Sequence, residues 1–246
     1  RPMLKEYEYV MAGDQEVQHE ELFLVDTTDK KLIKVSVEKW PDQTLRLFTP
    51  GEKVNSLYFL RKKRTCDEID FCKVDLKTGE VKVLINEISK PYFNNDFFHL
   101  SLLNEGKDII WWSERTGHGH FYHYDGEGNL KNAITSGNWT AGKMVKIDTV
   151  GRTIYFGAYG QEKGACPYYA RVNKARIDGN GQVEVLTPEQ ATHEAYFSKS
   201  GRYFVDNYSR ADLEPRSVLR DNKGKVIMEL ASPDLTRLYE TGWKMP

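Results

Sequence analysis

A recurring unit of strand, aspartate, short turn and strand most limits what this chain can fold into. In each copy an apolar run ends in Asp, a polar turn that usually contains Gly follows, and a second apolar run comes next. The aspartates lie about 50 residues apart and are Asp26, Asp75, Asp125, Asp178 and Asp221. Gly tolerates positive φ, and the Asp side chain hydrogen-bonds to nearby backbone, so both residues favour tight turns. Flanking residues that alternate between apolar and polar, or are apolar throughout, predict strands.

A second predicted hairpin precedes several of these units. Glu105-Gly106, Gly151 and Gly201 each lie between two strand-like runs. Two hairpins give four strands in about 50 residues, which is typical of a β-propeller blade. Helical periodicity is almost absent, and its best candidate is the segment from Ser232 to Glu240.

We therefore expect an all-β chain that forms one partial β-propeller domain over residues 1–246. The expected units are a partial blade at about 7–37 and complete four-stranded antiparallel blades at about 43–85, 97–135, 142–186 and 193–230. About four to five blades do not close easily into a ring. We expect them to belong to a larger, eight-bladed propeller.

Composition agrees with packed strands and excludes several other classes. Aromatic residues make up 12% of the chain, which is high for a helical bundle and natural for β-sheets. The 35 basic and 36 acidic residues give a net charge of -1, which removes the broad electrostatic argument for nucleic acid or an anionic membrane. Cys66, Cys72 and Cys166 lack metal-ligand or C-x-x-C spacing, and three thiols cannot make a disulfide framework.

No membrane segment or signal peptide is expected within the chain. The most apolar runs, 97–103 and 109–112, are far shorter than the roughly 20 residues of a spanning helix. The opening RPMLKEYEY has no apolar run behind a basic start and no initiator Met. We interpret it as a cut inside a longer protein, called the parent below, whose targeting signal would lie outside this chain.

The stretch WWSERTGHGHFYHYDGEGNLKNAITSGNW, residues 111–139, is more specific than a generic blade. It resembles the dipeptidyl peptidase IV N-terminal propeller family, within the prolyl oligopeptidase superfamily of serine peptidases. The matching positions are Ser113, Glu114, Arg115, Gly117, His120, Asp125, Ile134, Thr135, Gly137 and Trp139. The opening RPMLKEYEYVMAGD, the last blade and the ending LTRLYETGWKMP are similar to the same family, so the resemblance covers essentially the whole chain.

The resemblance implies an exopeptidase parent that removes dipeptides, or tripeptides in close relatives, with proline-type specificity. The family's catalytic Ser lies in a G-x-S-x-G turn of an α/β-hydrolase domain, and that pattern does not occur in these 246 residues. We therefore expect no catalytic residue and no hydrolysis in this chain alone. The implied partners are a peptide substrate and a C-terminal α/β-hydrolase domain, with no cofactor and a periplasmic or exported location.

The resemblance also points to Phe93, with Tyr92 beside it, as substrate-binding residues. In the family the connection between two blades carries an aromatic that reaches the central cavity and contacts extended substrates. Ordinary packing between blades is the alternative for Phe93. Asn94 and Asn95 replace the family's arginines, so any contact with substrate would be less charged. The family's paired glutamates, which hold the substrate's free α-amino group, precede the RPxL-type opening. Glu20 and Glu21 follow that opening and are therefore interpreted as solvated blade residues.

Three histidines, His118, His120 and His123, raise the alternative of a metal site. Side chains at i and i+2 share a strand face, and imidazole suits Zn or Cu. His123 would point to the other face, and no carboxylate or thiol completes a shell in sequence. We therefore expect turn and strand residues, with His120 matching the family's packing histidine, and no metal.

A stand-alone propeller that binds peptide or carbohydrate is the alternative function, with Trp111, Trp112 and Trp139 as stacking candidates. For either function, a terminal repeat without its neighbour exposes apolar surface and unpaired strand groups. We expect two copies of this chain to pair as a homodimer and relieve that exposure.

Overall fold

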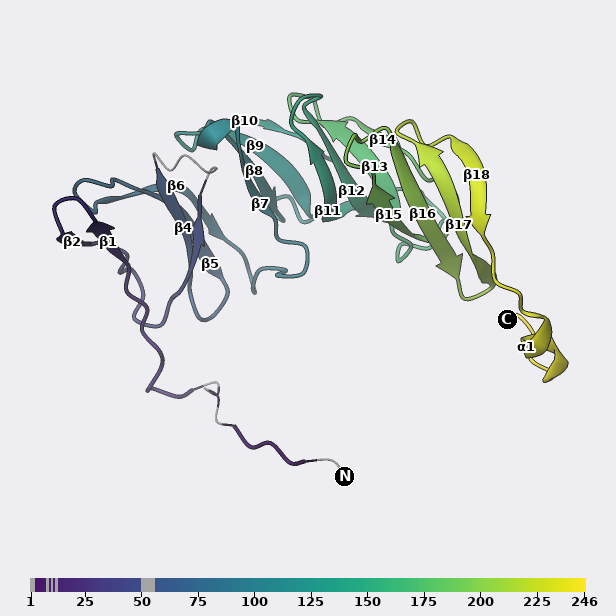
Figure 1. The fold of residues 1–246 in the computed structure, drawn as a ribbon, viewed down its shortest axis with the longest axis horizontal. Helices are drawn as coiled ribbons and strands as arrows, with labels where there is room; N and C mark the ends of the chain where they lie inside the picture. Colours follow the sequence, from purple (N-terminus) through teal and green to yellow (C-terminus); the bar gives the residue numbers. More distant parts are fainter. Residues whose placement is uncertain (1–2, 8, 10, 12, 50–55) are drawn as a thin grey trace. The chain divides into compact units, whose positions relative to one another are not determined.

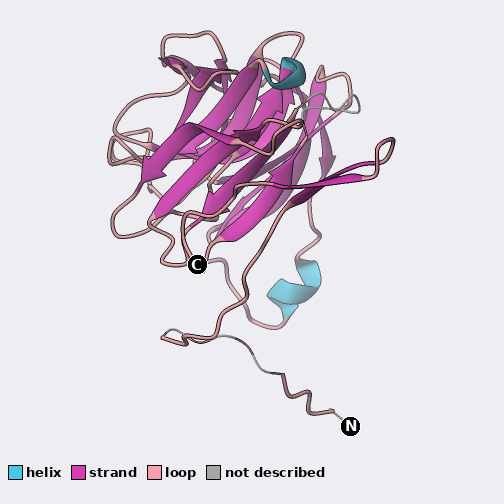
Figure 2. Ribbon diagram, turned by 90° about the vertical axis from the view of Figure 1, so that its left-hand side faces the viewer, coloured by secondary structure: helices cyan, strands magenta, loops and turns pink. Residues whose placement is uncertain are grey.

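The computed structural model describes residues 3–7, 9, 11, 13–49 and 56–246. They form two compact units, Arg1–Phe93 and Asn94–Pro246. Strands dominate, and helical structure is confined to two short segments of the described residues (Figure 2). Neither is long and apolar enough to cross a membrane.

The first unit contains a hairpin and a four-stranded antiparallel sheet (Figure 1). The hairpin pairs β1 (Phe23–Asp26) with β2 (Lys31–Lys34). The sheet follows chain order, with β3 (Thr44–Phe48), β4 (Leu57–Lys62), β5 (Glu68–Val74) and β6 (Val81–Ile88).

The core of the first unit lies between that hairpin and the sheet. Phe59 and Cys72, from the central strands β4 and β5, are fully buried beside Val35 and Val37. Leu24 of β1 packs against the same cluster. The hairpin is thereby attached to the sheet through apolar contacts, which stabilise in proportion to the area removed from water.

The second unit contains three more four-stranded antiparallel sheets, each in chain order (Figure 1). Two short helices accompany them. The first sheet has β7 (Leu100–Leu103), β8 (Asp108–Ser113), β9 (His120–Asp125) and β10 (Leu130–Ala133), with the 3-10 turn η1 (Asn104–Gly106) between β7 and β8. The next has β11 (Thr140–Asp148), β12 (Thr153–Tyr159), β13 (Arg171–Arg176) and β14 (Val183–Val185). The last has β15 (Thr192–Phe197), β16 (Tyr203–Arg210), β17 (Leu213–Asp221) and β18 (Val226–Ala231), followed by α1 (Thr236–Glu240).

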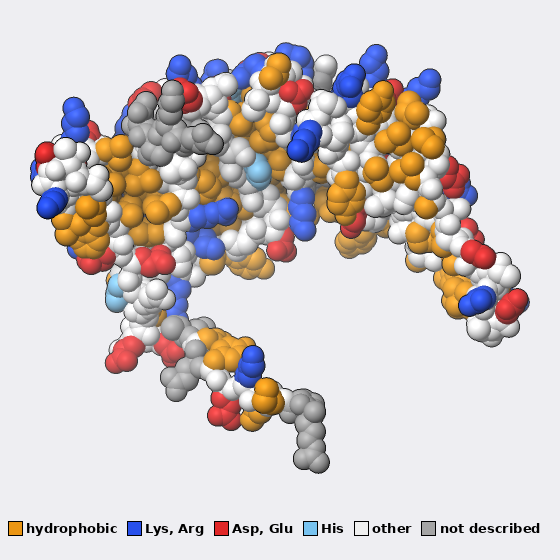
Figure 3. All heavy atoms as spheres, in the orientation of Figure 1, with side chains coloured by type: hydrophobic (Ala, Val, Ile, Leu, Met, Phe, Trp, Pro, Cys, Tyr) orange, Lys and Arg blue, Asp and Glu red, His pale blue; other side chains and the backbone are white. Residues whose placement is uncertain are grey.

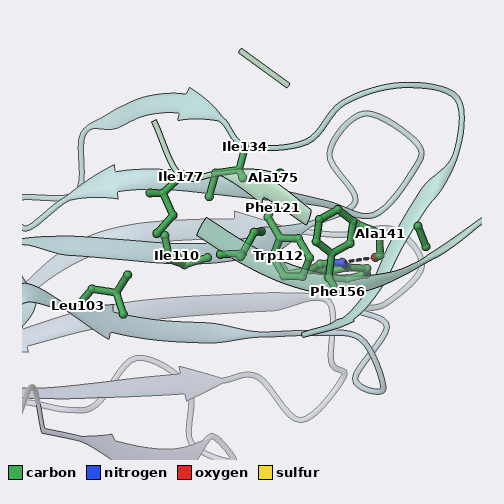
Figure 4. Close-up of a cluster of buried hydrophobic side chains, with 11 residues drawn as sticks. Leu103, Ile110, Trp112, Phe121, Ile134, Ala141, Phe156, Ala175 and Ile177 are labelled. Atoms are coloured by element: carbon green, nitrogen blue, oxygen red, sulfur yellow. Dashed lines mark hydrogen bonds between the residues drawn. The ribbon is translucent and has the colours of Figure 1, made fainter. Parts of the chain in front are cut away.

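Aromatic side chains join the β7–β10 sheet to the β11–β14 sheet (Figure 4). Phe121 meets Phe156 edge to face, with ring centroids 5.4 Å apart. The indole Nε1 of Trp112 donates to the Ala141 carbonyl at 2.7 Å, which satisfies the polar atom of an otherwise apolar side chain. Gly119 leaves room for this ring, because a Cβ there would lie 2.2 Å from Cζ2 of Trp112.

Four of the five repeat aspartates make the turns that their sequence predicts. The carboxylates of Asp26, Asp75, Asp125 and Asp221 accept backbone amide hydrogens two to four residues further on. The fifth, Asp178, is the exception to the expectation. Its carboxylate binds the guanidinium of Arg152, with Nη2–Oδ1 at 2.7 Å, because that charged donor lies in the neighbouring β11–β12 turn.

The four sheets span 44–88, 100–133, 140–185 and 192–231, and the hairpin spans 23–34. Four antiparallel strands in chain order are the arrangement of a propeller blade. The helix α1 begins at Thr236, so it covers only the second part of the segment from Ser232 to Glu240 suggested by sequence. That the whole chain is one partial domain stays a prediction.

Candidate functional site

The predicted substrate-binding pair lies in the loop that leaves β6. The Lys90–Pro91 peptide bond in this loop is cis. Tyr92 is 63% exposed, whereas Phe93 is 5% exposed. In this structure the accessible ring of the pair is therefore Tyr92, and the buried ring of Phe93 suits the packing alternative. Contact of either ring with substrate stays a prediction.

Backbone hydrogen bonds fix this loop to the connection between β4 and β5. The Phe93 amide donates to the Cys66 carbonyl at 2.8 Å, and the Ser89 amide donates to the Asp67 carbonyl at 2.9 Å. The Ser89 hydroxyl donates to the Tyr92 carbonyl at 3.2 Å. Tyr92 is consequently presented from a loop that is held at both ends.

Glu20 and Glu21, interpreted from sequence as blade residues, have local partners. Glu20 accepts the backbone amide hydrogen of Leu45, and Glu21 pairs with the ammonium of Lys34. Both glutamates line a hollow of about 400 Å³ together with Lys39. They hold the hairpin and the edge strand β3 in place.

The first sheet also contains a buried charge cluster centred on Asp70, which is 0% exposed. Its carboxylate accepts from the Arg61 guanidinium at 2.8 Å, from the Lys39 ammonium at 2.9 Å and from the Asn86 amide at 2.6 Å. Burial by itself would raise the pKa of Asp70, but these donors lower it. Two cations and an amide leave this carboxylate little capacity for acid–base chemistry, so the cluster is structural.

Of the three candidate metal histidines, His120 and His123 lie on β9 and are buried in the β7–β10 sheet, whereas His118 precedes that strand. His120 contacts the Thr135 hydroxyl and the Gly137 carbonyl, each at 3.0 Å, and its ring packs edge-on against Trp139. Burial lowers the pKa of His120. Within the described part of the chain, no group of three His, Cys, Asp or Glu side chains has an arrangement that could hold a metal ion.

His123 belongs to a charge cluster that joins two sheets of the second unit. Its Nε2 lies 2.6 Å from the Asp108 carboxylate, which also accepts from Arg152 at 3.2 Å. Arg152 in turn holds Asp178, and the Asn132 amide donates to the carbonyls of Ile177 and Gly179. The pKa of Asp108 is lowered to about 2, because hydrogen bonds from these neighbours outweigh the burial that would raise it.

The last sheet has a third cluster, in which the buried side chains of His193, Asp206 and Arg220 meet. Asp206 accepts from the Arg220 Nε at 2.8 Å and contacts Nδ1 of His193 at 2.9 Å. His193 Nε2 lies 3.0 Å from the Glu189 carbonyl, and Arg220 pairs with the Glu189 carboxylate at 2.8 Å. Sequence reasoning identified none of these three clusters, since most of their members are far apart in the sequence and carry no local motif.

The tryptophans proposed for a stand-alone binding module are largely inside the molecule. Trp111 and Trp112 are 0% and 1% exposed. Trp139 is half-buried and stacks on Phe156 with ring centroids 6.2 Å apart. Stacking of these rings on sugars or peptides would require disruption of the core, so they do not support that alternative.

A family comparison decides what this chain is similar to. The model of the dipeptidyl peptidase IV (DPP IV) N-terminal region matches residues 1–215. The chain belongs to that family. The resemblance inferred from sequence is therefore confirmed.

Curated relatives and solved structures agree with this assignment. A probable dipeptidyl peptidase 4 of Trichophyton verrucosum is 24% identical over 204 residues, which cover 78% of this chain and 26% of that protein. Dipeptidyl peptidase 4 of Arthroderma otae is 26% identical over 202 residues, which cover 78% of this chain and 25% of that protein. The chain thus spans about a quarter of the length of these relatives.

The crystal structure of Porphyromonas gingivalis dipeptidyl peptidase 4 superposes with a TM-score of 0.71 at 25% identity, covering 90% of this chain and 30% of that one. A putative dipeptidyl aminopeptidase IV from Bacteroides ovatus gives a TM-score of 0.65 at 20% identity, covering 85% and 32% of the two chains, and supports the fold alone. The predicted all-β propeller fold is confirmed by the sheets and by the likeness to the Porphyromonas gingivalis structure.

Proposed function

We propose that this chain is the non-catalytic propeller part of a serine exopeptidase that removes dipeptides, or tripeptides, from peptide N-termini with proline-type specificity. The observation that carries the proposal is the family match over residues 1–215. The relatives are a probable dipeptidyl peptidase 4 and a dipeptidyl peptidase 4, which supports the dipeptidyl form of the reaction.

In this proposal the chemistry belongs to an α/β-hydrolase domain of the parent. That domain would supply the serine nucleophile for acyl transfer. The propeller would allow only peptides to reach the active site and would guide them to the hydrolase domain. The charge clusters around Asp70, Asp108 and Asp206 would contribute by holding the sheets in shape, because their ions are mutually paired. We place the parent in the periplasm or outside the cell, a proposal that rests on the family resemblance.

The loop carrying Tyr92 and Phe93 is the proposed peptide contact. Tyr92 is exposed on a loop that is held by three hydrogen bonds to backbone carbonyls. The side chain could therefore contact a peptide without a rearrangement of the loop. Loss of an aromatic contact should cost about 1–3 kcal/mol where the substrate desolvates the ring. Phe93 would join the contact only after its ring leaves the buried position.

Two substrates of different length test this contact in the parent. Tyr92→Ala should weaken turnover of a peptide of eight or more residues more than turnover of a dipeptide chromogenic substrate, because only the long peptide reaches the loop. Tyr168→Ala, which removes another exposed tyrosine, is the matched control and should leave both unchanged. Equal effects of Tyr92→Ala on the two substrates would remove this loop from the proposal.

The predicted pairing of two copies stays a proposal, and the edge strand β18 is its proposed contact. Val226, Ile227, Met228 and Leu230 are 44–52% exposed, and hydrophobic side chains gather over the last sheet (Figure 3). An edge strand with apolar side chains is a template for pairing with another strand. Sedimentation equilibrium over a dilution series should show a dimer, and a single species of 28.5 kDa at every micromolar concentration would contradict it.

A further inference from the structure

The connection between β4 and β5, residues 63–67, forms a tight turn that we call the hairpin tip. The Lys63 amide donates to the Glu68 carbonyl at 3.0 Å, and the Cys66 amide donates to the Lys63 carbonyl at 2.8 Å. Cys66 has a φ of 57°, a left-handed conformation that is uncommon for residues other than Gly. The Lys63 ammonium pairs with Asp67 at 3.3 Å across the turn. The tip therefore has one specific shape, to which other segments can attach.

One attachment is the N-terminal turn, defined here by Met11, Gly13 and Asp14. The Asp14 amide donates to the Met11 carbonyl at 3.2 Å, and the Asp14 carboxylate accepts the Met11 amide hydrogen at 2.7 Å. Arg64 of the tip donates from Nη1 to the Asp14 carbonyl at 2.9 Å and from Nη2 to the Met11 carbonyl. Met11 is 54% exposed, so apolar burial of its side chain contributes little to holding the turn.

The other attachment is the peptide-contact loop of residues 89–93. The Phe93 and Ser89 amides donate to the carbonyls of Cys66 and Asp67, and both acceptors lie within three residues of Arg64. The tip thus lies between the N-terminal turn and the loop. A shift of the tip would move the carbonyls that both Phe93 and Ser89 use as acceptors.

We propose that the hairpin tip holds the N-terminal turn and the peptide-contact loop as one unit, with Arg64 as the positioning residue. The effect of this unit on substrate binding rests on the proposed function. Arg64 suits the task because a planar guanidinium presents two donors in a fixed geometry to two carbonyls. A lysine keeps the charge but offers no such pair of parallel donors, so Arg64→Lys should fail to replace it.

Hydrogen–deuterium exchange of the whole chain tests this coupling without any activity. Arg64→Ala and Arg64→Lys should each speed exchange at least tenfold at the Met11 and Asp14 amides and also at the Phe93 amide. Arg176→Lys is the matched control, since Arg176 is exposed on β13 and makes no side-chain hydrogen bond within the described part of the chain; it should change neither region. Faster exchange in the N-terminal turn with an unchanged Phe93 amide would overturn the proposal, as would no change in either.

Steady-state kinetics of the parent test whether the unit formed by the hairpin tip, the N-terminal turn and the peptide-contact loop positions the substrate. We expect Arg64→Lys to raise KM for a long peptide at least fivefold with kcat within twofold, because the catalytic groups are untouched. An unchanged KM, or a parallel loss of kcat and thermal stability, would make Arg64 merely structural and overturn its positioning role. A parent without peptidase activity would refute the proposed function, while the exchange result would still decide whether the tip couples the two segments.

Discussion

Asp206→Asn is a sharp perturbation of the last sheet, because it keeps the shape of the side chain and removes its charge. Asp206 is 0% exposed and lies between Arg220, which is 2% exposed, and His193. The substitution leaves a buried guanidinium facing a neutral amide. The second carboxylate on Arg220, Glu189 at 2.8 Å, remains in place.

The expected loss of stability follows from these contacts. Removal of one partner from a buried ion pair costs about 3–5 kcal/mol, because the other charge stays buried and uncompensated. Glu189 still neutralises part of the charge on Arg220, so we expect the lower end, about 3 kcal/mol. With a urea m-value of about 2 kcal/mol/M, the unfolding midpoint should fall by about 1.5 M.

Tryptophan fluorescence during urea unfolding is a suitable assay. Trp111, Trp112, Trp139 and Trp243 lie in the same unit as Asp206, whereas Trp40 lies in the other. Asp212→Asn is the matched control, because it removes the same charge from an exposed pair with Arg210 and should leave the midpoint unchanged. Equal midpoints for the two variants would refute the reasoning that burial makes the Asp206 pair important.

Two further predictions concern a turn and a titrating group. Gly224 and Gly117 have φ values of 82° and 88°, but an added Cβ would lie 2.2 Å from the Leu186 carbonyl oxygen at Gly224 and meet nothing within 4 Å at Gly117. In both Ala variants the left-handed backbone costs about 1–2 kcal/mol. Only Gly224→Ala adds the clash, so its urea midpoint should be lower than that of Gly117→Ala, and equal midpoints would contradict the predicted clash. The pKa of Asp108 lies at about 2 instead of 3.8 in the folded chain, so its stabilisation is present above pH 4 and lost as the pH falls through about 2. Asp108→Asn should flatten the fall in urea midpoint between pH 4 and 2, whereas a curve parallel to that of the unchanged chain would contradict the assignment.

The blades could be predicted from sequence because their signals are local. Turn residues such as Asp75 and Asp125 act on the backbone two to four residues away, and strand periodicity extends over single strands. Asp178 shows the limit of this reasoning. It has the same local pattern, yet a distant partner, Arg152, takes its carboxylate.

The candidate site depends on contacts that no local pattern reveals. The burial of Phe93 against the exposure of Tyr92 depends on how the loop meets the β4–β5 turn, more than 20 residues earlier in the chain. The hydrogen bond from Arg64 to the Asp14 carbonyl joins residues 50 positions apart. The sequence resemblance therefore predicts the aromatic pair as a peptide contact, and only the structure shows which ring is accessible and what holds it.

Product analysis tests the central claim most directly. The parent is incubated with a peptide that carries proline at the second position, and the products are identified by mass spectrometry alongside those of residues 1–246 alone. We predict release of the N-terminal dipeptide, or of a tripeptide from a suitable sequence, by the parent and no product from the 246-residue chain. An intact peptide after incubation with the parent, or cleavage only at internal bonds, would contradict the claim that this chain is the propeller part of an exopeptidase.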